Sequence, residues 1–162
     1  MRMMTATIWP LIRIGALATL SMDLLTGAAT ALRLIAPLPP NLVGRWFASV
    51  ARMKPLHTDI ARSAPVRHEL VLALPVHYAI GITLAMLFIW ATGQMGWTRT
   101  GGLALVFALC TSVLPWLLMF PAMGYGAFGG HGPEGTRLFS SSLVTHAFFG
   151  VGLWIALELV RL

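Results

Sequence analysis

The sequence predicts an all-α, polytopic membrane protein: a four-transmembrane-helix bundle with a short interfacial amphipathic helix in the first loop. Of its 162 residues, 57% are hydrophobic and only 10% are charged, whereas soluble domains carry about 25% charged residues. Four apolar stretches also reach the length of about 20 residues that a bilayer crossing requires. We therefore expect a single membrane domain, residues 1–162, with the lipid bilayer as its main partner.

The four predicted spans cover about residues 11–33, 70–93, 102–121 and 139–160. In the first span, Asp23 is the only charged residue between Arg13 and Arg33. The second span lies between Glu69 and Arg99, and the fourth begins after Arg137. The short connections after the second span favour packing of neighbouring helices into a small bundle.

The loop of residues 34–69 contains a predicted amphipathic helix at about residues 41–53. Three prolines end the first span, and the apolar residues that follow recur at helical spacing. One face carries Leu42, Val43, Trp46, Phe47, Val50 and Met53, and the cations Arg45, Arg52 and Lys54 lie on or beside the opposite face. Such a helix either lies in the membrane interface with its cations near the headgroups, or packs on the bundle as a cap.

The distribution of basic residues predicts the orientation in the membrane. One side of the bilayer receives Arg33, Arg45, Arg52, Lys54, Arg62, Arg67 and Arg137, and the other receives Arg2, Arg13, Arg99 and Arg161. Because cytoplasmic loops carry the excess of Lys and Arg, loop 34–69 is expected in the cytoplasm and both termini in the periplasm of a bacterial inner membrane. A cleaved signal peptide is the alternative for the N-terminus, although Asp23 inside the apolar run argues against it.

The remaining composition excludes several classes of function. The net charge of +6 reflects loop topology, and no aromatic and basic surface indicates a nucleic-acid partner. Cys110 is the only cysteine, so the chain has no internal disulfide or thiol relay. No serine or cysteine stands visibly beside a base, so an enzymatic role is not favoured, although it stays open.

Asp23 lies at the centre of the first span, where burial of a carboxyl group costs roughly 2.5–3.5 kcal/mol. Thr19, Asp23, Thr26 and Thr30 are spaced by four, three and four residues and therefore share one helix face. Gly15 and Gly27 extend this face with small residues. We expect a polar seam that faces neighbouring helices.

Two histidines are the predicted partners of this seam. "HYAIGITL" begins at His77 and "HAFFGVGL" at His146, and both follow the pattern His, three residues, Gly, two residues, Leu. Both histidines are expected at a depth similar to that of Asp23, and Gly81 and Gly150 lie one turn beyond them as packing positions. The match suggests a duplicated pair of helices without proving it.

Several chemistries suit this Asp/His/His centre. The favoured interpretation is proton- or ion-linked transport, or binding of a small ligand or metal, by a ligand or proton-relay set of Asp23, His77, His146, Glu69, Tyr78, Thr19 and Thr26. Asp23, His77 and His146 also suit a divalent metal ion, and His77 with His146 could ligate haem b in a subunit, or an assembly subunit, of an electron-transfer complex. The polar groups could instead merely hold the bundle together. The protein is expected to form a homo-oligomer or to join a membrane complex.

Six motifs together carry a resemblance to a known family. They are "LVGRW" at Leu42, "HTDIA" at His57, "PVRHE" at Pro65, "HYAIG" at His77, "FPAMG" at Phe120 and "SLVTHAFFGVGLW" at Ser142. This succession resembles the bacterial membrane-protein family known as domain of unknown function 2938, over nearly the whole chain. The resemblance implies a four-span inner-membrane protein and brings no established reaction. It places these residues in motif positions: Asp23, His57, Asp59, Glu69, His77, Tyr78, Gly81, Arg137, His146 and Gly150.

Overall fold

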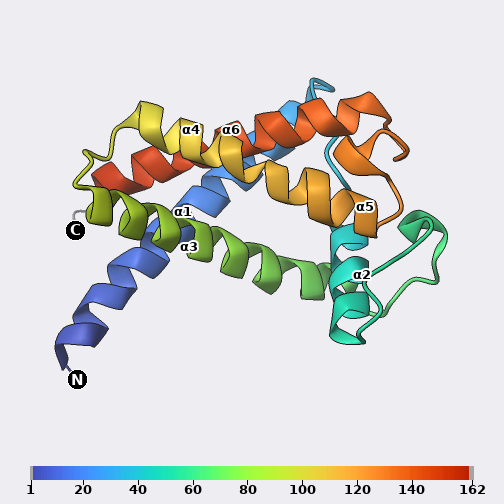
Figure 1. Ribbon diagram of the computed structural model, residues 1–162, viewed down its shortest axis with the longest axis horizontal. Helices are drawn as coiled ribbons and strands as arrows, with labels where there is room; N and C mark the ends of the chain where they lie inside the picture. Colours follow the sequence, from blue (N-terminus) through green and yellow to red (C-terminus); the bar gives the residue numbers. More distant parts are fainter. Residues whose placement is uncertain (1, 161–162) are drawn as a thin grey trace. The chain divides into compact units, whose positions relative to one another are not determined.

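The computed structural model describes the backbone of residues 2–160 and the side chains of residues 8–160. Arg2 and Arg161, which entered the charge count above, therefore have no described side chain. All regular structure in the described range is helical (Figure 1). The predicted all-α fold class is confirmed.

Within residues 2–160, four helical stretches are long and apolar enough to cross a membrane, as predicted. α1 (Arg2–Ala31) provides the stretch Ile8–Ala31, α3 (Glu69–Met95) and α6 (Thr136–Leu159) provide two more, and the other is Gly101–Ala122. In a bilayer every backbone N–H and C=O must find a partner inside the protein, and a helix satisfies them within one segment. The chain is a multi-pass membrane protein.

The stretch Gly101–Ala122 is not one regular helix. It consists of α4 (Gly101–Thr111), the π-helical turn η2 (Pro115–Met119) and the short α5 (Phe120–Ala122). Pro115 has no N–H to donate and its ring crowds the preceding turn, which accounts for the wider helix that follows it. Pro75, by contrast, lies within an unbroken α3.

Three short helices lie in the loops. α2 (Pro40–Ala51) begins at a proline whose fixed φ suits a first helical turn. η1 (Ile60–Arg62) follows it, with the Asp59 side chain accepting a hydrogen bond from the N–H of Ala61. η3 (Ala127–Gly129) lies in the glycine-rich loop before α6.

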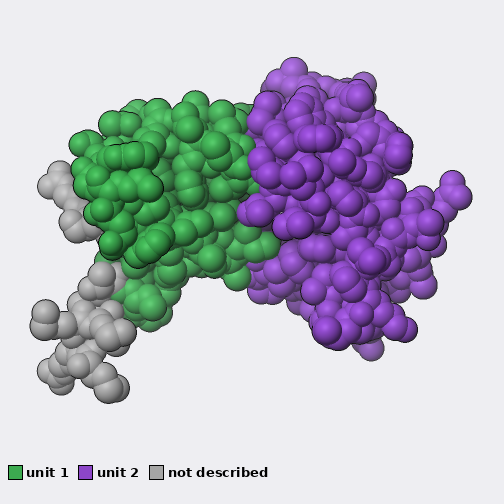
Figure 2. Space-filling model, viewed as in Figure 1, with its two compact units in different colours: residues 1–28, 78–111, 145–162 green, residues 29–77, 112–144 purple. Residues whose placement is uncertain are grey.

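The chain divides into two compact units, coloured separately in Figure 2. Unit 1 comprises residues 1–28, 78–111 and 145–162. Its core is made mainly of small and aromatic side chains: Ile14, Ala18, Ala85, Phe88, Ala104, Ala108, Phe149, Leu153, Ala156 and Val160. Alanines in the core let helix backbones approach closely, which is how helices associate where lipid removes the hydrophobic driving force.

Unit 2 comprises residues 29–77 and 112–144. Its core contains Leu42, Ile60, Phe120, Met123, Tyr125 and Leu138. Two backbone hydrogen bonds join the first loop to the region after η2: His57 N–H to Ala122 O at 2.8 Å, and Ile60 N–H to Met123 O at 3.0 Å. Two loops far apart in sequence therefore fold as one packed body.

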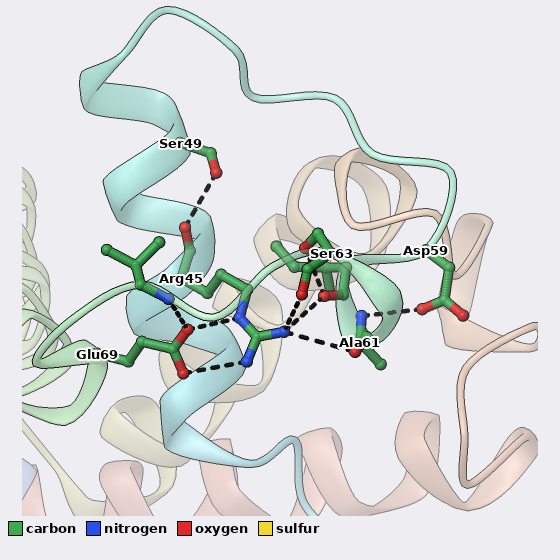
Figure 3. A network of polar contacts seen from close by, with 8 residues as sticks. Arg45, Ser49, Asp59, Ala61, Ser63 and Glu69 are labelled. Atoms are coloured by element: carbon green, nitrogen blue, oxygen red, sulfur yellow. Dashed lines mark hydrogen bonds and ion pairs between the residues drawn. The ribbon is translucent and has the colours of Figure 1, made fainter.

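A buried ion pair holds the first loop together (Figure 3). The guanidinium of Arg45, on α2, donates from Nε to Oε1 of Glu69 at 2.6 Å and from Nη2 to Oε2 at 3.2 Å. Its Nη1 donates to the carbonyls of Ile60 at 3.1 Å and Ser63 at 2.8 Å. The two charged side chains are only 7% and 9% exposed. One side chain thus connects α2, η1 and the start of α3.

The position of Arg45 corrects one detail of the predicted amphipathic helix. Arg45 was expected among the cations on the polar face, but it is buried together with Leu42 and Gly44. The reason is close packing: a Cβ added at Gly44 would overlap the carbonyl oxygen of Glu69, so α2 lies directly on the start of α3. Within unit 2, α2 is a packing helix, and its interfacial placement stays a prediction.

We predict that Arg45→Ala destabilises the protein by about 3 kcal/mol, because it leaves the Glu69 carboxylate buried without its counter-ion. The measurement is heat-induced unfolding in detergent micelles. Arg62→Ala is the matched control: Arg62 pairs with Asp59 at 3.2 Å but is 89% exposed, so its loss should cost less than about 1 kcal/mol. Equal effects of the two substitutions would contradict the structural role of Arg45.

Candidate functional site

The polar seam of α1 faces the interior of unit 1. Ile14, Ala18 and Thr19 have no exposed surface, whereas Leu24 is 66% exposed. Asp23 lies between these faces and is half-buried. The rotation of the helix therefore turns Leu20, Leu24 and Leu25 outward and leaves Asp23 at the edge of the buried face.

Asp23 has a partner on α3. The hydroxyl of Tyr78 donates a hydrogen bond to the Asp23 carboxylate. A phenol brings a donor into a low-dielectric region without adding a second charge, so it stabilises the carboxylate and leaves it able to accept a proton. Both residues are in the predicted relay set, and the structure brings them together.

The other seam residues fix how closely α1 and α3 approach. The Thr19 hydroxyl donates to Gly15 O at 2.8 Å, and a Cβ added at Gly81 would overlap that hydroxyl oxygen. Gly15 likewise lies against the backbone of Ile82. The predicted seam residue Gly27, however, has no neighbouring atom within 4 Å of an added Cβ and faces outward.

His146, on α6, is held by a threonine of α4. Thr111 Oγ1 lies 2.9 Å from His146 Nδ1, and the same hydroxyl donates to Ala108 O at 2.6 Å. The hydroxyl has a single proton to give, so Thr111 accepts from Nδ1 in the tautomer that carries its proton there. This contact joins α4 to α6 at His146, an imidazole of the predicted relay set.

The helix that carries His146 packs tightly on its glycines. A Cβ at Gly150 would lie 2.9 Å from the Cα of Leu105, and one at Gly152 would lie 2.8 Å from Ala18 O. Atoms of α4 thus occupy the space that a flat ligand beside Gly150 would need. The packing therefore gives no support to the haem alternative.

The comparison with known families agrees with these motifs. The sequence profile of one family, described only as a protein of unknown function, matches residues 12–160. The chain belongs to the DUF2938 family. Neither a curated protein nor a solved structure matches it. Membership in DUF2938 confirms the resemblance found in the sequence and assigns no reaction.

The remaining family-motif residues of the predicted set belong to unit 2. His77 is half-buried on α3, and Glu69 is paired with Arg45 as described above. Between residues 2 and 160, no three His, Cys, Asp or Glu side chains form a group that could hold a metal ion. The metal and haem sets, each of which combines His77 with a residue of unit 1, remain predictions, as does the role of Thr26.

Sequence reasoning missed two functional candidates. Thr111 was not singled out, although a hydroxyl in the apolar run "ALCTSVLP" was a usable signal.

Tyr125 was not singled out either: it is 2% exposed, and its hydroxyl has no hydrogen-bond partner among the described residues. Burial raises the pKa of Tyr125, the charge of Asp59 raises it further, and Arg45 opposes them. Tyr125 is thus a neutral core residue of unit 2.

We predict that Gly81→Ala destabilises the protein by about 1–3 kcal/mol, because the added methyl group forces α3 away from Thr19. Unfolding in detergent measures the loss. Gly27→Ala, on the open face of α1, is the matched control and should be neutral or slightly stabilising. Thr19→Ala combined with Gly81→Ala should recover part of the loss, and no recovery would show that the clash lies elsewhere.

Proposed function

We propose that this DUF2938 protein carries out proton- or ion-linked transport across the bacterial inner membrane, with Asp23 and His146 as its titrating groups. The observation that carries the proposal is the hydrogen bond from Tyr78 to a carboxylate in the middle of a membrane span. An ionisable residue at that depth is expensive and is functional by default.

The partners of the two groups support reversible protonation. Tyr78 and Thr111 are neutral, so neither fixes the charge of the residue that it contacts. An imidazole ordinarily titrates close to neutrality and a carboxyl group at lower pH, and each can both accept and release a proton, which suits them to a proton relay. His77 remains a candidate third member of the relay. Glu69, held by the Arg45 guanidinium, is better suited to anchor the first loop than to carry protons.

The proposal includes an orientation and an assembly state. The excess of basic residues in loop 34–69 supports a cytoplasmic position for this loop and periplasmic termini. Four spans rarely enclose a pathway alone, so we propose a homo-oligomer or a subunit of a membrane complex. In a Cys110→Ala background, a cysteine at exposed Lys54 should react with an impermeant maleimide only after the cells are opened. Labelling of intact cells would overturn this orientation.

The flux test uses purified protein in liposomes that contain a pH-sensitive dye, with a potassium diffusion potential as the driving force. Wild-type protein should carry protons inward. Asp23→Asn, which keeps the shape but not the titratable group, should reduce the flux at least about tenfold. Tyr78→Phe should give an intermediate loss.

Thr83→Val is the matched control for the flux test. Thr83 is exposed on the same helix as Tyr78, and its hydroxyl donates to Ala79 O of its own helix at 2.8 Å. The proton flux of Thr83→Val should equal that of the wild type. Unchanged flux in Asp23→Asn, or the absence of wild-type flux, would remove the proton-conducting form of the proposal.

One observation favours a second candidate, metal binding at His146. Histidines that bind metals commonly form a hydrogen bond through their other ring nitrogen, and His146 Nδ1 lies 2.9 Å from the Thr111 hydroxyl. On this alternative, purified wild-type protein holds near-stoichiometric metal and His146→Ala holds none. Elemental analysis of the two preparations measures the difference. Metal-free wild-type protein would exclude metal binding at His146.

A further inference from the structure

A groove of about 480 Å³ lies in unit 2. Its walls are the end of α1, the segment that follows α1 and the start of α6. Arg33 and Arg137 line it together with Glu134. Ile35 and Leu38 contribute an apolar lining. The groove therefore combines two cations and one anion with an apolar wall.

The two arginines are exposed and are not neutralised within the protein. In the part of the chain that the structure describes, neither guanidinium makes a hydrogen bond or an ion pair. Arg45, in the same unit, is by contrast saturated by Glu69 and by backbone carbonyls. Two arginines against one glutamate leave the groove positively charged, which favours an anionic ligand.

The backbone along the groove supplies few competing donors. Pro37, Pro39 and Pro40 have no N–H, and the N–H of Ala36 already donates to Ser141 Oγ at 2.8 Å. An anion bound here must therefore be held chiefly by the guanidinium groups. Arginine suits this task, because its planar fork matches the oxygens of phosphate and can bond to two of them at once.

The position along the chain identifies the source of the phosphate. Arg33 follows the span Ile8–Ala31 by two residues, and Arg137 is the second residue of the span Thr136–Leu159. Both arginines thus stand where apolar helix meets water, which is the level of the lipid headgroups. Ile35 and Leu38 offer apolar contacts for the glycerol and the upper acyl chain.

We propose that this groove binds an anionic phospholipid of the phosphatidylglycerol class, with its phosphate held by Arg33 and Arg137. The site is independent of the proton-linked function proposed above. It would fasten the end of α1 to the start of α6 through a lipid, and would add specificity to the general attraction between basic loops and anionic membranes.

The test measures the unfolding temperature of detergent-solubilised protein as phosphatidylglycerol, phosphatidylcholine, phosphatidylethanolamine or inorganic phosphate is added. Only phosphatidylglycerol should stabilise the wild type strongly. The variant Arg33→Gly/Arg137→Gln should need about tenfold more phosphatidylglycerol to reach half of the maximal rise in unfolding temperature. Glycine suits position 33 because Arg33 has a φ of +59°, so Arg33→Gly alone should fold and already bind more weakly.

Arg52→Gln/Lys54→Gln is the matched control, because it removes two exposed cations of the same unit that do not line the groove. This variant should respond to phosphatidylglycerol like the wild type. An equal loss in the control would overturn the proposal in favour of diffuse charge attraction. Equal stabilisation by a zwitterionic lipid would overturn the anionic assignment, and equal stabilisation by inorganic phosphate would indicate a soluble ligand instead.

Discussion

A bilayer offers no hydrogen-bond partners, and this constraint organises the whole protein. It accounts for the long helices, which satisfy their backbone groups internally. It also accounts for the contacts of three polar side chains in the membrane-crossing segments: Asp23 with Tyr78, His146 with Thr111, and Thr19 with the carbonyl of Gly15. Each of these contacts lowers the free-energy cost of placing a polar group in an apolar environment.

Two of the paired carboxylates, Glu69 and Asp23, illustrate two different uses of that constraint. Glu69 meets a guanidinium that also holds backbone carbonyls, so its charge is fixed and the pair ties α2 and η1 to α3. Asp23 meets the phenol of Tyr78, a neutral partner that adds no fixed charge beside the carboxylate. The first arrangement suits architecture and the second suits proton transfer.

Close helix packing positions the polar groups. Gly15 and Gly81 bring α1 against α3, and Gly150 brings α6 against α4. Larger residues at these positions would hold the helices further apart and lengthen the hydrogen bonds to Asp23 and His146. The small residues that favour association in lipid thus also set the geometry of the candidate site.

The sequence by itself determined the fold class, the four spans, the polar face of α1 and the glycines, because hydropathy and helical spacing are local properties. It also placed Asp23, Tyr78 and His146 among the candidates. Only the tertiary structure decided their partners, since the choice of Tyr78 and Thr111 depends on the relative rotation and depth of separate helices. The same holds for Arg45. Local periodicity put it on or beside a polar face, but its ion pair with Glu69, 24 residues away in the sequence, is buried in the core of unit 2. Spacing within one helix fixes which residues share a face, and packing between helices fixes what that face meets.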